Sequence, residues 1–430
     1  MSQSQTVADR RKTVRVLLAS LVGTSVEFYD FYIYATATSL VFGPLFFPAS
    51  STSAQLLSSY ASFGLAFLAR PLGGVLFGHF GDRVGRKSTL VASLLLMGGS
   101  TAAIAFLPTF AMVGWIAPAL LCLLRFGQGL GLGGEWSGAA LLAVENAPPG
   151  WRARFGMVPQ LGAPLGFIAA NGFFLILGAT LSLDQFRDWG WRVPFLASAL
   201  LVGLGMWVRL RLTETTAFTA ALRDEQPARV PVMLVLKQHA GAAVAGTLGV
   251  IACFALYYIA TAFALGYGTT TLGYDRQSFL QAQLGAILFM AAGIIAAGWL
   301  ADSVGERRVL LGGCVATMVV GTLLPSLLGS GSMTGVFAFM AIALLAMGFV
   351  YGPLGAWLPG LFPARVRYTG SSLAFNLGGV IGGGLTPAFA QVMAERGGLP
   401  PVGVYLASAA VLSATGLLLS RRKRQATDLR

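Results

Sequence analysis

Five ionisable side chains stand inside stretches that are otherwise apolar: Glu27, Asp30, Arg70, Arg125 and Glu135. A charged group at the centre of a membrane helix costs about 2.5–3.5 kcal/mol on insertion scales. Helix packing does not require such groups, so each is a candidate for function. A carboxylate in a low-dielectric site can bind and release a proton, and a guanidinium group matches the geometry of a carboxylate. These residue types indicate chemistry with protons and small anions.

The depths of these groups predict which of them meet. At 1.5 Å per helical residue, Glu27 and Arg70 share a level roughly 15 Å deep, and Asp30 lies nearer to Arg125. Glu27 and Asp30 are three residues apart and are expected to share one helix face. We predict Asp30 as the proton-coupling residue, with Glu27 and Glu135 next, and Arg125 as the group that binds an anionic substrate. The alternative is static packing pairs, Glu27 with Arg70 and Asp30 with Arg125, while Glu135 could pair with a loop arginine.

Further polar and aromatic residues in apolar stretches could complete a binding site, although each could equally serve ordinary packing. The predicted substrate-binding set is Arg125, Arg70, Gln128, Tyr32, Gln160, Asn171, Tyr257, Tyr258, Tyr351, Trp357 and Asn376.

The composition places these groups in a membrane protein. The 430 residues are 56% hydrophobic and only 10% charged, whereas soluble domains carry about 25% charged residues. The 56 glycines suit close contacts between membrane helices. Three cysteines in apolar runs give no disulfide framework, and two distant histidines predict no metal site. The first apolar run is too long for a cleavable signal peptide and is expected to remain as a helix.

Twelve apolar stretches are long enough to cross a bilayer, where only helices satisfy their own backbone. We therefore predict an all-α membrane protein, with twelve transmembrane helices in two pseudo-symmetric six-helix bundles. The predicted spans are residues 16–43, 56–80, 88–107, 112–145, 153–179, 192–212, 240–266, 279–301, 309–328, 334–361, 368–394 and 400–420. The predicted units are an N-terminus (1–15), two bundles (16–212 and 240–420), a linker (213–239) and a basic tail (421–430).

Basic residues are distributed unevenly over the connections. If the helices alternate in direction, 23 of the 29 lysines and arginines fall on one side, and basic loops stay cytoplasmic. The other side carries only Arg187, Arg192, Arg276 and Arg396. The net charge of +13 is therefore a topology signal rather than a sign of nucleic-acid binding. Both termini are expected in the cytoplasm, with the chain in a bacterial inner (plasma) membrane.

The two predicted bundles contain similar sequence motifs at equivalent positions. GHFGDRVGRK (78–87) is matched 220 residues later by GWLADSVGER (298–307), and RARFG (152–156) is matched by RVRYTG (365–370). Transporters are built from such paired repeats, with substrate held between the halves. The predicted gating motif comprises Gly78, Asp82, Arg83, Gly85, Arg86, Asp302, Gly305 and Arg307.

A mechanical role is predicted for these loops. Gly78 would allow close helix contact, and Asp82 would accept hydrogen bonds from the start of span 368–394, where the helix dipole favours an anion. Asp302 would do the same at the start of span 153–179, although the second latch could be weaker because Glu306 stands where the first has Arg86. The alternative is that these charges only set topology. Helix breakers at 161–166 and 376–387 occupy matching positions and would permit bending or close packing.

The loop motif GHFGDRVGRK resembles that of the major facilitator superfamily. EFYDF, RFGQGLGLGGEW and WGWRVPF narrow the resemblance to the metabolite:proton symporter family, which includes transporters for shikimate, oxoglutarate, citrate and proline/betaine. The resemblance covers essentially the whole chain. It implies proton-driven uptake through a central cavity that opens to each side in turn, and a cavity lined by the first and fourth helices. The short tail RRKRQATDLR does not match the coiled coil of the osmosensing betaine branch.

The resulting hypothesis is a secondary transporter that imports a small organic acid with protons. The alternatives are a proton-coupled carrier of a zwitterion such as a betaine or amino acid, a channel, and a membrane enzyme. No Ser/His, Cys/His or metal constellation supports an enzyme. GLGLGG (129–134) matches G-x-G-x-x-G, but no strand precedes it, which argues against dinucleotide binding. We expect a monomer that needs no cofactor and whose partners are the substrate, protons and the lipid bilayer.

Overall fold

Nearly all of the described chain is helical. The computed structural model describes residues 3–49, 51–83, 86–210 and 231–420. Within these ranges, eleven helical segments are long and apolar enough to cross a membrane, and Val91–Ile104 is a shorter apolar helix. The prediction of an all-α membrane fold is confirmed.

The first half of the chain consists of helices that alternate in direction, several of them interrupted. Its elements are α1 (Gln3–Ala37), η1 (Thr38–Phe42), α2 (Gly43–Phe46), α3 (Thr52–Arg83), α4 (Arg86–Ile104), α5 (Phe110–Val113), α6 (Ile116–Leu132), α7 (Glu135–Glu145), α8 (Arg152–Gln160), α9 (Gly162–Thr180), α10 (Leu183–Asp188), η2 (Gly190–Arg192) and α11 (Val193–Leu210).

The second half has the same plan. Its elements are α13 (Pro231–Gln238), α14 (Ala240–Gly249), α15 (Ile251–Tyr258), η3 (Ile259–Phe263), α16 (Ala264–Thr270), α17 (Arg276–Val304), α18 (Glu306–Leu328), α19 (Met333–Tyr351), α20 (Leu354–Trp357), η4 (Pro359–Leu361), η5 (Ala364–Val366), α21 (Arg367–Gly379), η6 (Val380–Gly384), α22 (Thr386–Gly397) and α23 (Leu399–Leu419).

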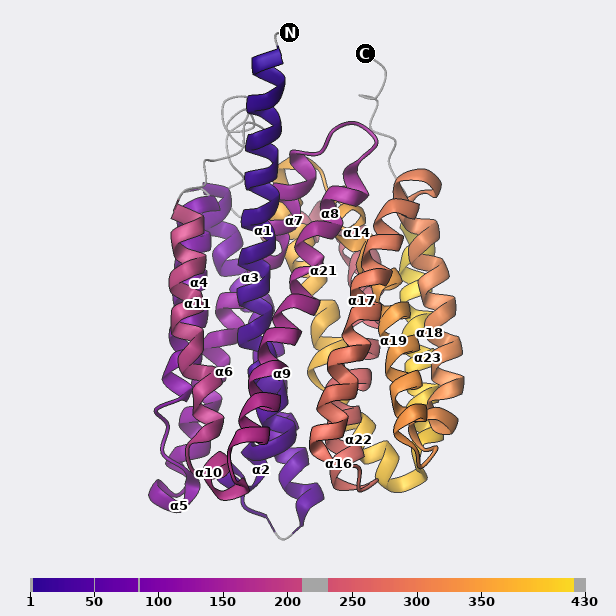
Figure 1. Cartoon of the computed structure of the whole chain (residues 1–430). Coiled ribbons are helices and arrows are strands. Elements are labelled where there is room, and N and C mark those ends of the chain that lie inside the picture. The colour runs from indigo at the N-terminus through magenta and orange to yellow at the C-terminus, as the bar shows by residue number, and fades with distance from the viewer. Residues whose placement is uncertain (1–2, 50, 84–85, 211–230, 421–430) are drawn as a thin grey trace.

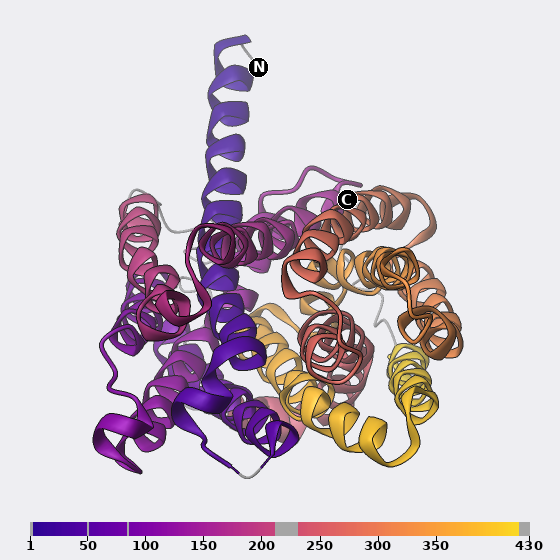
Figure 2. The same ribbon diagram turned by 60° about the horizontal axis from the view of Figure 1, so that its bottom comes forward.

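The two halves stand side by side as separate groups of helices. Figure 1 shows the first half on the left and the second on the right, with the start of α1 and the end of α23 at the top. Figure 2, turned so that the bottom of Figure 1 comes forward, shows the same two groups. The halves meet where α9 and α8 pack against α17, and where α3 packs against α21 and η6. We call the side on which α1 starts and α23 ends the termini side, and the opposite side the far side.

The helix interruptions recur in both halves. The π-helical segments η1 and η3 lie about 220 positions apart, as do the break between α8 and α9 at Leu161 and the π-helical segment η6. The last pair falls within the stretches 161–166 and 376–387 predicted from glycine and proline. In a bilayer, neighbouring helices must satisfy the backbone groups that such interruptions release.

Two hydroxyl groups show how this requirement is met. At the break between α14 and α15, Ser413 Oγ donates to Leu248 O (2.8 Å) and accepts from Ala252 N (2.7 Å). Near the break between α8 and α9, Thr24 Oγ1 donates to Pro159 O (2.8 Å). The breaks are therefore built into the packing rather than left open.

Some boundaries differ from the predicted ones. Helix α1 begins at Gln3, ahead of the predicted span 16–43, and the stretch that is long and apolar enough to cross a membrane begins at Val16, as predicted. The predicted linker 213–239 contains helix α13, while its residues 213–230 and the predicted tail 421–430 lie outside the described residues. Gly305 has a positive φ of 95°, which suits the turn between α17 and α18 and favours glycine there.

We expect Gly348→Ala to destabilise the protein. A Cβ atom at this position would lie 2.5 Å from Gly293 C and Ile294 N, so α17 and α19 would have to separate. The expected loss is about 1–3 kcal/mol, seen as a lower midpoint of thermal unfolding in detergent. Gly312→Ala is the matched control, because nothing lies within 4 Å of its Cβ position. Equal midpoints for the two variants would contradict the close crossing.

Candidate functional site

A cavity lies between the two halves, with an empty volume of about 580 Å³. Its first-half wall comes from α1, α3, α6, α7 and α9, and its second-half wall from α15, α17, α19 and α21. The lining residues are Glu27, Phe28, Tyr32, Arg70, Leu132, Trp136, Ala163, Cys253, Phe254, Tyr257, Tyr258, Met290, Met347, Tyr351, Phe375 and Asn376. We call this space the central cavity.

Two opposite charges line the central cavity. Glu27 and Arg70 both face it, and both are buried from the outside of the molecule. The two groups lie close enough to interact electrostatically. The guanidinium carbon of Arg70 lies 4.4 Å from the ring centre of Phe31 and 4.5 Å from that of Phe67, and Arg70 Nε has no hydrogen-bond partner among the described residues. Aromatic faces hold the cation in place while leaving donor capacity for a ligand.

Tyrosine side chains supply most of the remaining polarity. Tyr32 and Tyr257 stack with ring centres 5.2 Å apart, which joins the two halves across the cavity. Tyr258 and Tyr351 complete this group. The hydroxyl groups of Tyr257 and Tyr351 have no hydrogen-bond partner within the described part of the chain. Among the described lining residues, the cavity therefore offers hydroxyl and aromatic contacts around one guanidinium and one carboxylate.

Arg125 does not line the central cavity in this conformation. Its side chain is fully buried inside the first half, with the guanidinium carbon 4.0 Å from the ring centre of Tyr34 and 4.3 Å from that of Phe31. Arg125 Nη1 donates to Gln128 Oε1 at 3.0 Å, and Gln128 in turn donates to Thr101. The prediction that Arg125 lies in the cavity used only its depth along the helix. Its side chain points into the first half instead, because the rotation of the helix sets that direction.

Asp30 is also enclosed within the first half. Its carboxylate lies beside Thr101 of α4 and Ser198 of α11, and neither of its oxygens has a hydrogen-bond partner among the described residues. The predicted alternative of an Asp30–Arg125 ion pair is wrong, since the structure shows no such pair within 4 Å. Glu27 and Asp30 were expected to share one helix face, yet Glu27 lines the central cavity and Asp30 is not among its lining residues. A spacing of three residues turns a helix by about 60°, enough for Glu27 to face the cavity and Asp30 the bundle interior.

The other predicted residues take different positions. Glu135 is buried and accepts a hydrogen bond from Ser93 Oγ (2.7 Å). Gln160 lies behind the cavity wall, where it accepts from Trp136 Nε1 at 3.0 Å. Asn171 accepts from Thr36 Oγ1 at 2.8 Å. Trp357 packs against Gly249, away from the cavity lining. Of the predicted substrate-binding set, the cavity brings together Arg70, Tyr32, Tyr257, Tyr258, Tyr351 and Asn376.

Several lining residues were not among the predictions. Trp136 and Phe28 belong to the quoted motifs GLGGEW and EFYDF, so their position beside a charged residue was a usable signal. Phe375 stacks on Trp136 with ring centres 3.7 Å apart. Met290 and Met347 have no comparable signal, because an apolar residue in an apolar helix can face lipid, core or cavity.

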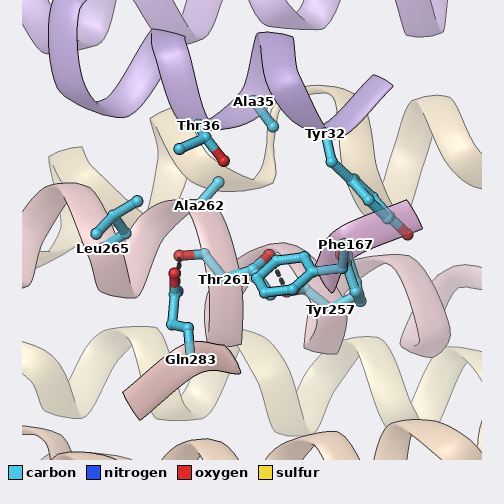
Figure 3. A pocket seen from close by; sticks show the side chains of 9 residues that line it. All are labelled: Tyr32, Ala35, Thr36, Phe167, Tyr257, Thr261, Ala262, Leu265 and Gln283. Atoms are coloured by element: carbon cyan, nitrogen blue, oxygen red, sulfur yellow. Dashed lines mark hydrogen bonds between the residues drawn. The ribbon is translucent and has the colours of Figure 1, made fainter. Parts of the chain in front are cut away.

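A smaller pocket lies on the far side of the central cavity. Figure 3 shows Thr36, Thr261 and Gln283 around it, with Tyr32 and Tyr257 at one end. The pocket has an empty volume of about 250 Å³. Gln283 Nε2 donates to Thr261 O at 3.0 Å. Because Tyr32 and Tyr257 line both spaces, their stacked rings form the partition between them.

Hydrogen bonds close the termini side between the halves. The helix is interrupted between α6 and α7, which leaves the carbonyls of Gly133 and Gly134 free to accept hydrogen bonds from other segments. Ser372 Oγ (2.6 Å) and Asn376 Nδ2 (2.7 Å) of α21 donate to Gly133 O, and the Tyr368 hydroxyl donates to Gly134 O. Within the glycine-rich stretch 129–134, the last two glycines thus bond to the other half through their carbonyls, while Gly129 and Gly131 pack closely on helices of their own half.

The second-half loop motif makes the predicted contact with the first half. Asp302 accepts hydrogen bonds from the backbone N–H groups of Ala153 (2.8 Å) and Arg154 (3.2 Å) at the start of α8, and it pairs with Arg154 Nε at 3.0 Å. These donors are the free N–H groups of a helix N-terminus, where an anion is favoured. Arg307 instead donates to Leu418 O within its own half.

The first-half loop motif is only partly visible. Gly78 packs against Thr369 at the start of α21, with 3.2 Å between its Cβ position and Thr369 Oγ1, as expected for close contact. The predicted contact of Asp82, and the roles of Arg83, Gly85 and Arg86, lie outside the described side chains.

The far side is closed by other contacts between the halves. Ser39 Oγ (3.3 Å) and the Tyr60 hydroxyl (2.9 Å) donate to Ala262 O in the π-helical segment η3. Gln277 Nε2 donates to Leu175 O at 3.0 Å. The central cavity thus lies between two sets of closing contacts, one towards each side of the membrane.

Comparisons with known proteins match this architecture. The family described as "Sugar (and other) transporter" matches residues 16–232 and 240–419. The inner membrane metabolite transport protein YhjE of Escherichia coli K12 is 47% identical over 417 residues, which cover 95% of this chain and 94% of the relative. The shikimate transporter of the same organism is 37% identical over 421 residues, covering 96% and 95%. The proton:xylose symporter XylE superposes with a TM-score of 0.74 at 15% identity, covering 95% of each chain.

We expect the loss of closing hydrogen bonds on the termini side to expose the central cavity. Cys253 lines the cavity and is buried, so its alkylation by N-ethylmaleimide reports opening, with Cys122 and Cys314 replaced by alanine. In Tyr368→Phe/Ser372→Ala, two hydrogen bonds of about 1 kcal/mol each are lost, so the labelling rate should rise roughly 30-fold.

Asp302→Asn should increase labelling in the same direction, because the negative charge at the α8 N-terminus is lost. Ser408→Ala is the control, since its hydroxyl bonds only within its own helix. Unchanged labelling in both test variants would show that these contacts do not hold the termini side closed.

Proposed function

The chain belongs to the sugar (and other) transporter family of the major facilitator superfamily, and from this premise we propose that it imports a small organic acid together with protons. It is a multi-pass membrane transporter and not an enzyme. The observation that carries the proposal is the pairing of Glu27 with Arg70 in one cavity between the halves.

Arg70 is the group proposed to bind the substrate carboxylate. It is the cavity's cation, and a guanidinium group recognises a carboxylate through two parallel hydrogen bonds. The tyrosine hydroxyls that face the same space suit additional hydroxyl or carbonyl groups on the solute, and Trp136 and Phe375 suit its carbon skeleton. A compact, oxygen-bearing acid fits this combination.

Glu27 is the residue proposed to couple the proton. With Glu27 ionised, its charge opposes that of Arg70 and disfavours a second anion in the same low-dielectric space. Protonation of Glu27 leaves Arg70 as a net positive charge, so solute anion and proton enter the cavity together. Asp30, the first choice from the sequence, has no place in the cavity lining and is proposed only as a secondary candidate. Glu135 is likewise outside it.

Transport is proposed to follow alternating access. The two sets of closing contacts on either side of the central cavity would break in turn, with the stacked Tyr32 and Tyr257 rings separating on the far side. The basic side of the chain is proposed to face the cytoplasm of a bacterial inner membrane, which places both termini inside. A monomer contains the whole proposed site.

A zwitterionic solute is the second candidate. Glu27 and Arg70 could bind an ammonium and a carboxylate at the same time, as an amino acid or betaine would require. The organic-acid and zwitterion proposals differ in the role of Glu27. In a zwitterion carrier the ionised Glu27 binds the ammonium group, whereas in an organic-acid carrier Glu27 carries the coupled proton.

We expect Arg70→Gln to abolish uptake of carboxylates. Loss of a buried, charge-assisted contact costs about 2–5 kcal/mol, or roughly 30-fold to several thousand-fold in apparent affinity. The measurement is proton flux into proteoliposomes on addition of shikimate and other small acids, proline, betaine or xylose. The control is Arg396→Gln, an arginine on the far side with no part in the cavity. Flux driven only by uncharged or cationic solutes would refute the proposal.

Glu27→Gln should separate proton coupling from solute exchange. A permanently neutral side chain mimics the protonated state, so counterflow of labelled substrate should persist while proton-driven accumulation falls to background. Asp30→Asn is the comparison and should retain accumulation. If Asp30→Asn abolishes proton-driven accumulation and Glu27→Gln does not, Asp30 rather than Glu27 is the proton-coupling residue. Loss of counterflow in Glu27→Gln, with binding of betaine or proline also lost, would favour the zwitterion carrier.

A further inference from the structure

On the far side, Arg276 of the second half packs on Phe186 of the first half, the neighbour in sequence of Arg187. Arg187 belongs to α10 of the first half, and Arg276 is the first residue of α17 in the second half. The guanidinium carbon of Arg276 lies 4.0 Å from the ring centre of Phe186. Arg187 is near enough to repel Arg276 electrostatically. In this arrangement, two like charges from opposite halves lie near each other.

The guanidinium group of Arg276 has spare donors. Its Nε and Nη2 atoms are buried and have no hydrogen-bond partner among the described residues. A buried guanidinium N–H without a partner costs free energy, and a nearby second cation adds to that cost. The aromatic contact with Phe186 offsets only part of it, because a ring face accepts no strong hydrogen bond.

The acids nearby do not neutralise this pair. Asp275 precedes Arg276, but its carboxylate caps α17 by accepting from Ser278 N (2.8 Å) and Ser278 Oγ (2.9 Å). The backbone N–H of Ser278 lowers the pKa of Asp275, which keeps it ionised in that role. Asp184 and Asp188 of α10 form no ion pair within 4 Å of either arginine in the described structure. The positive end of the α17 dipole adds to the local positive potential.

We propose that Arg187 and Arg276 form an anion-binding site at the far-side seam, separate from the central cavity. Its ligand is a carboxylate or phosphate group, which accepts hydrogen bonds from the free Nε and Nη2 of Arg276 and offsets the repulsion from Arg187. The group could come from a dissolved acid or from a lipid headgroup. The site does not depend on which solute the central cavity carries.

Because the site lies between the two halves, a bound anion would affect whether the far side is closed. One arginine comes from each half, and Gln277, next to Arg276, already links the halves through Leu175 O. An anion between the two guanidinium groups stabilises the far-side-closed arrangement, whereas an empty site favours separation. Under the proposed topology, the site faces the outside of the cell.

The test is thermal unfolding of the purified full-length protein in an uncharged detergent. Sodium malonate and sodium phosphate are compared with sodium chloride at equal ionic strength, and phosphatidylglycerol is added in a separate series. Malonate, phosphate or phosphatidylglycerol should raise the midpoint of the wild type, by on the order of 2 °C or more. Stabilisation by the dissolved anions identifies a solute site, and stabilisation by phosphatidylglycerol alone identifies a lipid headgroup site.

Arg276→Gln and Arg187→Gln should lose this response, and Arg276→Gln should have a higher midpoint than the wild type in chloride, because the repulsion is gone. Arg396→Gln, which lies at the end of α22, should keep the whole response. Arg70→Gln removes the proposed carboxylate site of the central cavity and should keep the response to phosphate. No shift with any anion, or an undiminished shift in Arg276→Gln, would overturn the proposal. A response lost in Arg70→Gln alone would assign the anion to the central cavity and would also overturn it.

Discussion

Polar groups that this chain places in the membrane can be satisfied only by the protein itself or by what enters its cavity, because hydrocarbon offers no partner. That constraint explains the contacts on which the two halves depend. The helix break at Gly133 and Gly134 releases carbonyls, and side chains of α21 in the opposite half satisfy them. The π-helical segment at 259–263 releases Ala262 O, and Tyr60 and Ser39 of the first half satisfy it. The interruptions that weaken individual helices thus provide the reversible contacts between the halves.

The same constraint separates the buried charges into two groups. Glu27 and Arg70 face the central cavity, where water, protons or a solute can solvate them in turn. Arg125 and Asp30 are enclosed by side chains of the first half, with Arg125 held among aromatic rings and Gln128. The second half contributes tyrosines, methionines and Asn376 to the cavity. One half therefore supplies the charge and the other supplies neutral polar and aromatic surface, so a bound solute contacts both.

The cavity and the closing contacts share residues. Asn376 lines the cavity and donates to Gly133 O, and Trp136 lines it while stacking on Phe375. On the far side, the stacked Tyr32 and Tyr257 rings divide the central cavity from the smaller pocket. A solute that touches these side chains competes directly with the contacts that keep the two sides closed. Such sharing is a physical route by which binding in the cavity can alter access from either side.

The sequence alone determined the all-α membrane fold, the repeat relating the halves and the contact of Asp302 with the start of α8. Each follows from properties written along the chain: apolar length, repeated motifs and the preference of an anion for a helix N-terminus. It also identified Arg70, Asn376 and four tyrosines that line the cavity. Only the tertiary structure decided which buried charges face that cavity. Depth along a helix is fixed by residue number, but the direction of a side chain depends on the rotation of each helix against its neighbours. Glu27 and Asp30 show the difference, since about 60° of rotation separates the cavity from the closed interior of the bundle.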